Sequence, residues 1–173
     1  MLIDKLKQMI RDIPDFPKKG ILFKDITPLL ADGKAFRTAI DGIAAQYSGR
    51  NIDLVVGVEA RGFIIAAALA YKLQAGTTLI RKSGKLPYRT YRASYALEYG
   101  SDALEIHQDA FLPGQRILMV DDLLATGGTI SAAIELITRL GGNVVGVAFL
   151  VELSFLDGRA KLKDYEVFSL VQF

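Results

Sequence analysis

The segment Asp121–Thr129 carries residue types that can hold a phosphate. It reads Asp-Asp-Leu-Leu-Ala-Thr-Gly-Gly-Thr and follows a short apolar run that predicts a buried strand. Gly127 and Gly128 allow backbone N–H groups to approach a ligand closely, and Thr126 and Thr129 add hydroxyl donors. The helix expected to begin here would add partial positive charge at its first turn. The segment therefore indicates a phosphate site, although a helix N-cap with a Gly-rich turn is the alternative for the glycines alone.

Asp121 and Asp122 place two adjacent carboxylates at the end of the same strand. Such groups are costly to bury without partners, and vicinal sugar hydroxyls or a hydrated cation would satisfy them. No Lys follows the glycines, so the loop is not a Walker A motif, and it lacks the G-x-G-x-x-G spacing of dinucleotide loops. A phosphate beside sugar hydroxyls predicts a sugar 5-phosphate as ligand.

The stretch 81–92 concentrates basic side chains with tyrosines among them. The basic residues are Arg81, Lys82, Lys85, Arg89 and Arg92. Three interpretations stay open at this point: a solvated basic face, a platform for single-stranded nucleic acid, or a lid that closes over a polyanion. The chain's net charge of +2 does not favour nucleic acid, and Ser83-Gly84 would give a lid its flexibility.

Arg61 follows another predicted strand, within Glu59-Ala60-Arg61-Gly62. A guanidinium at a strand end can present a bidentate fork to a phosphate. The alternative is an arginine at a helix start that merely pairs with Glu59. His107, the one histidine, is interpreted as a surface or packing residue.

Periodicity supplies the elements that must position these residues. Helical spacing predicts helices near residues 2–10, 36–47, 62–74 and 130–140. Short apolar runs predict strands at 53–58, 77–80, 116–120, 144–151 and 166–171. Apolar strands that alternate with helices indicate an α/β domain, a parallel sheet covered on both faces, here with a small N-terminal flap. Ligands of such sheets bind at the carboxyl ends of the strands.

Composition limits the class of protein. The chain has 173 residues, 51% of them hydrophobic and 23% charged, which is typical of one globular domain. With no Cys, a disulfide framework or thiolate zinc site is excluded, and a single His does not favour a histidine metal site. Charges at Asp4, Lys5 and Lys7 are not typical of a signal peptide, so we expect a cytoplasmic protein.

The segment Val120–Thr129 resembles the signature of the type I phosphoribosyltransferases, which bind 5-phosphoribosyl 1-pyrophosphate (PRPP). Its form with two aspartates is similar to that of the adenine branch of this family. Four further segments agree, in order along nearly the whole chain: FPKKGILFKDITP (16–28), EARGF (59–63), RKSGKLP (81–87) and ASYALEYG (93–100).

The resemblance implies one phosphoribosyltransferase domain over residues 1–173, with residues 1–30 as helix and base-covering flap and residues 31–173 as the PRPP-binding core. It implies transfer of the phosphoribosyl group from PRPP to N9 of adenine, giving AMP and pyrophosphate in purine salvage. It also implies a homodimer, and Mg²⁺ held mainly through PRPP and pyrophosphate, with no direct protein ligand expected.

The resemblance also assigns site residues. PRPP-binding residues would be Arg61, Arg81, Lys82, Lys85, Asp121, Asp122, Ala125, Thr126, Gly127, Gly128 and Thr129. Adenine would be bound by Leu22, Phe23 and Lys24, with Phe23 as the stacking ring, and the catalytic residues would be Glu98 and Arg61. Taken alone, Glu98 fits an exposed edge strand and Phe23 fits a core aromatic.

Three other functions remain to be weighed. A relative acting on a 6-oxopurine would keep the PRPP site, but Ala125 and the flap argue against it, because hypoxanthine-guanine enzymes typically have an acidic residue at the position of Ala125. A PRPP-sensing regulator would usually carry an extra DNA-binding domain, for which the chain has too few residues before its first sheet strand. A generic sugar-phosphate-binding domain would explain neither the basic stretch nor Glu98.

Overall fold

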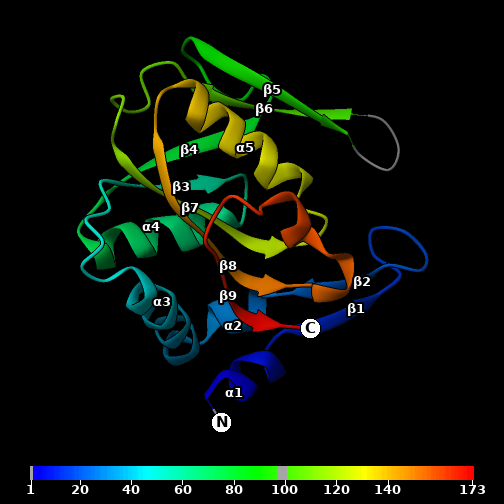
Figure 1. The fold of residues 1–173 in the computed structure, drawn as a ribbon. Helices are drawn as coiled ribbons and strands as arrows, with labels where there is room; N and C mark the ends of the chain where they lie inside the picture. The colour runs from blue at the N-terminus through cyan, green and yellow to red at the C-terminus, as the bar shows by residue number, and fades with distance from the viewer. Residues whose placement is uncertain (1, 97–100) are drawn as a thin grey trace.

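The structure, a computed structural model, describes residues 2–96 and 101–173, with two sheets and covering helices (Figure 1). The helices are α1 (Leu2–Gln8), α2 (Thr27–Ala31), α3 (Gly33–Tyr47), α4 (Gly62–Leu73) and α5 (Gly128–Arg139), with short 3-10 turns η1 (Ser154–Leu156) and η2 (Gly158–Lys161). The strands are β1 (Arg11–Pro14), β2 (Leu22–Asp25), β3 (Leu54–Val58), β4 (Gly76–Lys82), β5 (Thr90–Ala96), β6 (Ser101–His107), β7 (Arg116–Leu124), β8 (Asn143–Glu152) and β9 (Val167–Gln172).

The main sheet has the order β5-β6-β4-β3-β7-β8-β9. The run from β4 to β9 is parallel, as the continuous apolar strands predicted. At the other edge β6 pairs antiparallel with both β4 and β5. The predicted α/β fold is confirmed, but the sheet is mixed, because the hairpin β5–β6 continues it at one edge.

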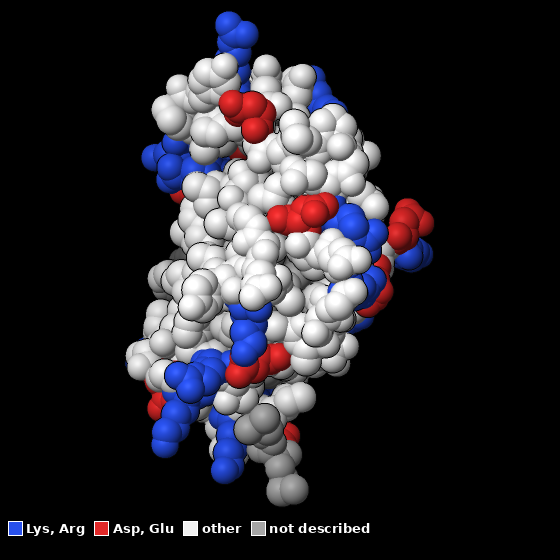
Figure 2. All heavy atoms as spheres, turned by 90° about the vertical axis from the view of Figure 1, so that its left-hand side faces the viewer, with Lys and Arg blue, Asp and Glu red and all other residues white. Residues whose placement is uncertain are grey.

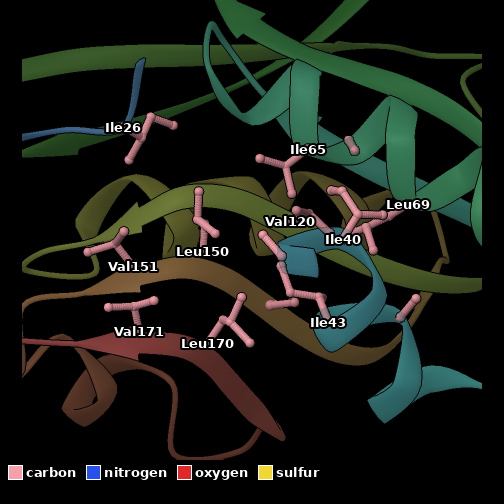
Figure 3. Close-up of a cluster of buried hydrophobic side chains, with 14 of the residues drawn as sticks. Ile26, Ile40, Ile43, Ile65, Leu69, Val120, Leu150, Val151, Leu170 and Val171 are labelled. Atoms are coloured by element: carbon pink, nitrogen blue, oxygen red, sulfur yellow. The ribbon is translucent and has the colours of Figure 1, made fainter. Parts of the chain in front are cut away.

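Two apolar layers cover the sheet because successive strand residues point to opposite faces. On one face Val55, Val120 and Leu150 pack against α3 and α4, as Figure 3 shows for part of this cluster. On the other face Val56 and Met119 join the cluster that includes α5. Both layers bury strand residues completely, which explains why the central strands lack polar alternation.

Local signals explain where the helices begin and end. Asp32 caps α3, because its Oδ1 accepts hydrogen bonds from the N–H groups of Lys34 (2.9 Å) and Ala35 (2.8 Å). Gln74 ends α4 in a left-handed conformation, and its N–H returns to the last carbonyls of the helix. The short α2 was not expected from the sequence.

The N-terminal part forms its own small sheet. Strands β1 and β2 pair antiparallel, with Asp12 opposite Lys24 and Ile13 opposite Phe23. Figure 1 shows this hairpin beside the ends of β8 and β9, with α1 below β9. The segment predicted as a flap, residues 16–28, therefore contains β2 and its preceding turn.

Two predicted boundaries were wrong. The strand expected over 116–120 continues to Leu124, so Asp121 and Asp122 lie within β7 rather than in the loop after it. The stretch 81–92 is not one loop, since Arg81 and Lys82 end β4 and Arg92 lies in β5. Pairing with β8 and with the hairpin β5–β6 lengthens these strands, and a single sequence does not display such pairing.

No helix within residues 2–96 and 101–173 is long and apolar enough to cross a membrane.

Candidate active site

The turn after β7 forms a small cradle, which we call the phosphate cradle (Ala125–Thr129). Gly127 has a φ of 79° and directly precedes α5, whose first-turn N–H groups have no partner within the helix. A cavity of about 80 Å³ lies here. It is lined by Asp121, Leu123, Leu124, Ala125, Thr126, Gly127, Gly128, Thr129, Ile130 and Phe149. The helix N-terminus and the free N–H groups make this cavity suitable for an anion.

Glycine contacts fix the shape of the cradle. A Cβ at Gly127 would lie 2.6 Å from the carbonyl oxygen of Gly158, and a Cβ at Gly158 would collide with the carbonyl oxygen of Ala125. Gly158 is far away in sequence, so its supporting role was not predicted. The backbone of η2 at Gly158 therefore packs directly on the cradle.

Asp121 and Asp122 adjoin the cradle from within β7. Asp122 is 6% exposed, and its N–H donates to Oδ1 of Asp121 over 2.9 Å. Burial, and then the neighbouring carboxylate of Asp122, raise the pKa of Asp121 well above its usual value. A Cβ at Gly62 would lie 2.6 Å from Oδ1 of Asp121, so glycine at the start of α4 leaves room for this carboxylate.

Arg61 connects this pair of carboxylates to the flap. Its Nε donates to Oδ2 of Asp122 over 2.5 Å, and its guanidinium carbon lies 5.0 Å from the centre of the Phe23 ring. The alternative in which Arg61 pairs with Glu59 was wrong, because Arg61 points across to β7. One side chain thus touches groups expected to bind ribose and groups expected to bind the base.

Glu59 instead holds the end of β4. Its Oε2 accepts hydrogen bonds from Nε of Arg81 (3.1 Å) and from the N–H of Lys82 (3.0 Å). Burial opposes ionisation of Glu59, but these donors bring the pKa of its carboxyl below the usual value. Arg61, Arg81 and Lys82 are called the cation cluster below. Glu59 was not predicted to be a site residue, although its position after a buried strand was a usable signal.

Each member of the cation cluster has a carboxylate partner. Arg61 bonds to Asp122, Arg81 bonds to Glu59, and Nζ of Lys82 lies 3.3 Å from Oδ2 of Asp102. An incoming polyanion would therefore compete with these carboxylates for the cations.

Residues 83–89, the basic loop, are attached to the sheet at their beginning. Oγ of Ser83 (2.7 Å) and the N–H of Gly84 (3.0 Å) donate to the buried carboxylate of Glu105 on β6. The exposed Lys85 follows, and its carbonyl accepts from Nη1 of Arg81 over 3.0 Å. Lys85 thus lies beside the cation cluster with its side chain in solvent.

The flap residues point in different directions. Leu22 is 48% exposed, and Phe23 meets Phe16 edge to face with ring centres 5.1 Å apart. Lys24 is the buried residue of β2 and bonds through Nζ to Oδ1 of Asp12 over 2.6 Å. Because Lys24 turns away from Phe23, its side chain is committed elsewhere and only its backbone remains for a ligand on the Phe23 side.

Most of the predicted site residues gather around the carboxyl ends of β3, β4 and β7. The cradle, the aspartates and the cation cluster are linked through the contacts above, with Phe23 beside Arg61. The side chain of Lys24 is not among them. Glu98 lies outside the described residues.

Comparison with known proteins gives one family throughout. Residues 29–172 match the family model "Phosphoribosyl transferase domain". The chain is 61% identical over 171 residues to the adenine phosphoribosyltransferase of Geobacter metallireducens, covering 99% of this chain and 100% of that protein.

Solved structures agree with the sequences. The crystal structure of adenine phosphoribosyltransferase from Thermoanaerobacter pseudethanolicus matches with a TM-score of 0.96 and 56% identity, covering 99% of both chains. The enzyme from Saccharomyces cerevisiae, complexed with an imino-altritol bisphosphate and adenine, matches with a TM-score of 0.94 and 39% identity, covering 98% of both. The chain therefore belongs to the phosphoribosyltransferase family, and its relatives over the full length are adenine phosphoribosyltransferases.

Proposed function

We propose that this protein transfers the 5-phosphoribosyl group from PRPP to N9 of adenine, giving AMP and pyrophosphate. This is the reaction of a glycosyltransferase in purine salvage. The observation that carries the proposal is the juxtaposition at β7: an anion-sized cradle, two aspartates beside it, and Arg61 bonded to the second aspartate. Full-length relatives named for this activity, and a relative solved with adenine, support it.

In this proposal the cradle and the aspartates bind the two ends of a ribose phosphate. The 5′-phosphate occupies the cavity of residues Ala125–Thr129, where backbone N–H groups at the start of α5 receive it. Asp121 and Asp122 then accept hydrogen bonds from the ribose hydroxyls, which satisfies their buried carboxylates. Binding energy far from the reacting carbon thereby positions that carbon.

The cation cluster, with Lys85, receives the pyrophosphate. Bond breaking at the anomeric carbon passes through an oxocarbenium-like state, as in other glycosyl transfers, while negative charge grows on the leaving group. Fixed cations stabilise that charge most effectively where water is excluded. Arg61 is the proposed catalytic residue of the cluster because it stands between the carboxylates and the flap.

Mg²⁺ fits this arrangement through oxygen atoms. Asp121 and Asp122 bring carboxylate oxygens to the region, which are the donors that Mg²⁺ prefers. Among residues 2–96 and 101–173, no group of three or more His, Cys, Asp or Glu side chains could hold a metal. We therefore propose that PRPP and pyrophosphate carry most of its ligands. When bound, the ion neutralises charge on the leaving pyrophosphate.

On the base side, we propose that Leu22, Phe23 and Lys24 bind adenine. Phe23 presents an aromatic face near Arg61, and a planar purine stacks well on such a face. Leu22 and Lys24 would contribute backbone groups to the edge of the base. Glu98 remains the proposed residue for proton transfer to or from the purine.

We propose that the chain divides into a helix and base-covering flap over residues 1–30 and a PRPP-binding core over residues 31–173.

We also propose a homodimer that uses the outer side of α4. Ile64 is 46% exposed and Tyr71 is 89% exposed on this helix, and both lie on its outer side with Ala67 and Ala68. Beside them, a groove of about 580 Å³ between α3 and α4 is lined in part by Phe36, Ile40 and Tyr71. Figure 2 shows that charged side chains are sparse across the middle of this face. Exposed apolar surface of this kind marks protein contacts.

A charged residue on that helix should separate the subunits. Tyr71→Asp is expected to shift the mass measured by light scattering after gel filtration from dimer to monomer. Lys34→Met, an exposed change at the start of α3, is the control and should leave the mass unchanged. A Tyr71→Asp protein that stays dimeric would contradict this choice of surface.

The activity is tested by incubating the protein with PRPP, Mg²⁺ and each purine base separately. We expect AMP and pyrophosphate from adenine, and loss of turnover in Glu98→Gln. Product from guanine or xanthine alone would keep the PRPP site and overturn the base assignment. No product from any base, with PRPP still bound, would indicate a regulator instead.

A cytoplasmic location is proposed from the amino-acid composition, and cell fractionation would test it.

A further inference from the structure

The flap strand β2 has an unusual buried residue. Leu22 is exposed, Phe23 and Asp25 are half-buried, and the one buried residue is Lys24, at 8% exposed, where an apolar residue would be expected. Lysine is rarely buried unless its charge is paired. A buried lysine in a short, peripheral two-stranded sheet therefore calls for a specific set of partners.

Lys24 has two partners of different kinds. Its Nζ lies 2.6 Å from Oδ1 of Asp12, which is the residue opposite it on β1. The same Nζ lies 3.8 Å from the centre of the Phe173 ring. The carboxylate neutralises the ammonium on one side, and the negative face of the ring receives it on the other.

Phe173 is itself held by the core. Its N–H donates to the carbonyl of Glu152 over 3.0 Å, and its carbonyl accepts from the N–H of Ser154 over 3.0 Å. A second ammonium, Nζ of Lys7 on α1, lies 4.4 Å from the same ring. The ring therefore joins α1 and β2 to the ends of β8 and β9.

The same β8 end also supports the phosphate cradle. The N–H of Leu153 donates to the carbonyl of Leu124 over 2.9 Å, directly before the cradle begins. Phe173 is thus anchored to the backbone that positions the cradle. A contact between Phe173 and the flap consequently relates the flap to the cradle.

Side chains along β2 point alternately to its two faces, so the contact between Phe173 and Lys24 also affects the face that lies toward the site. Neighbouring residues of a strand point to opposite faces, so fixing Lys24 toward Phe173 points Phe23 the other way. On that side the Phe23 ring lies 5.0 Å from the guanidinium carbon of Arg61. A buried, paired charge can fix one arrangement of a strand, as a buried polar residue fixes the register of a coiled coil, whereas an apolar residue can be accommodated in several.

We propose that Phe173 and Lys24 form a clamp that positions the flap and thereby sets the affinity for the purine base. Both act as positioning residues through Phe23 and the backbone of β2. The inference rests on the proposed function, in which β2 binds adenine. It predicts that loss of the clamp weakens binding of the base and leaves PRPP binding intact.

Phe173→Leu removes the aromatic face and keeps an apolar side chain. We expect KM for adenine, measured at saturating PRPP, to rise about three- to tenfold, the range that loss of one or two cation–π contacts allows. KM for PRPP at saturating adenine should stay within about 1.5-fold, less than the roughly two- to fivefold change that one such contact produces. Phe173→Tyr keeps the ring and should behave like the wild type, whereas Lys24→Met should behave like Phe173→Leu.

Hydrogen exchange provides a readout that does not depend on turnover. Amides of residues 22–25 should exchange faster in Phe173→Leu and Lys24→Met, while amides of β7 should not change. Lys34→Met is the control for removing an exposed lysine. If Phe173→Leu fails to fold, Lys24→Met and the exchange measurement carry the test.

The outcomes separate the clamp from the proposed function. Failure of the wild type to use adenine would overturn the proposed function, and exchange in β2 would still test the clamp. The clamp is overturned if the variants show wild-type KM for adenine and unchanged exchange in β2. It is also overturned if KM rises equally for adenine and PRPP, because a general loss of structure would then explain the effect.

Discussion

The phosphate cradle presents backbone groups, whereas the cation cluster presents long side chains. The cradle owes its shape to Gly127 and Gly158, whose α-carbons leave no room for a side chain. The cluster owes its shape to ion pairs, since Arg61, Arg81 and Lys82 each bond to a carboxylate. One half of the site is therefore set by packing, and the other half is set by charge.

This difference affects how each half meets its ligand. The N–H groups of the cradle need no rearrangement to receive a phosphate, because the turn at η2 already supports them. The cations must exchange a protein carboxylate for a ligand oxygen, and the Coulomb gain of that exchange depends on salt. A substitution in the cradle should thus act through steric clash and remove most of the activity with PRPP. A substitution in the cation cluster should change the affinity for PRPP by a smaller, salt-dependent amount.

The largest effect is expected for Gly127→Ala. The new Cβ would lie 2.6 Å from the carbonyl oxygen of Gly158, and the φ of 79° would strain any residue with a side chain. Displacing the cradle by about 1 Å should lower kcat/KM for PRPP by about 100-fold. Steady-state kinetics with PRPP varied would measure this.

Gly33→Ala is the matched control for that change. Gly33 begins α3, has open space around its Cβ position and has no positive φ, so activity should stay near the wild-type value. A Gly127→Ala enzyme with normal kcat/KM would show that the cradle adapts, and the contrast between the two halves would fail.

A smaller, graded effect is expected for Glu59→Gln. The amide keeps the shape of the side chain but loses the charge that holds Arg81 and the N–H of Lys82. PRPP must replace this carboxylate at the cations, and a hydrogen bond to a charged group contributes about 1.5–3 kcal/mol, so loss of the competing charge should lower KM for PRPP by about tenfold. The fall should depend on salt, because it concerns the charge that neutralises the cations.

Glu166→Gln provides the matched control for Glu59→Gln. Glu166 also pairs with an arginine, Arg50, over 2.6 Å, but it is 59% exposed and directly precedes β9, at the edge of the sheet opposite to the carboxyl ends of the parallel strands. Exposed pairs of this kind contribute little, so KM should not change. Equal effects in the two variants would mean that Glu59 acts on general stability and not on the cluster.

Much of the site was predictable because it follows the chain in short segments. The cradle, the two aspartates and Arg61 come directly after apolar runs, and periodicity alone places such residues at one edge of a parallel sheet. Resemblance to a family then supplied roles that periodicity does not contain, such as those of Leu22 and Lys85.

The unpredicted contacts of the site depend on residues that are distant in sequence. Gly158 supports Ala125, Glu59 holds Arg81, and Phe173 contacts Lys24. A local pattern cannot display these pairings, because each forms only after separate strands have been placed side by side. The same reason explains why β7 was predicted too short and the hairpin β5–β6 was not predicted.

The smallest effect concerns stability at Asp121. Burial and the neighbouring Asp122 raise the pKa of this carboxyl in the folded protein. Below the pKa of Asp121 in the unfolded chain, the carboxyl is neutral in both the folded and the unfolded state and does not lower the stability. As the pH rises above that pKa, the unfolded chain ionises first, so the contribution of Asp121 to stability falls toward neutral pH. Asp121→Asn removes this cost, and its melting temperature should exceed that of the wild type by more at pH 7.5 than at pH 4.

Asp25→Asn should change the melting temperature in the opposite direction to Asp121→Asn and thereby sharpen the comparison. The pKa of Asp25 is lowered, first by the N–H of Thr27 and then by its hydroxyl, so its carboxylate stabilises the fold above its unfolded value and loses that effect in acid. Asp25→Asn should therefore melt below the wild type at pH 7.5 and still at pH 4, with the difference shrinking only as the pH falls below the unfolded pKa of 3.8. Thermal melts of both variants at pH 7.5 and pH 4, and of Asp25→Asn also at about pH 3, measure this. If Asp121→Asn followed the course of Asp25→Asn, the carboxyl of Asp121 would be stabilised in its ionised form, and the proposal that ribose hydroxyls relieve its burial would lose its physical basis.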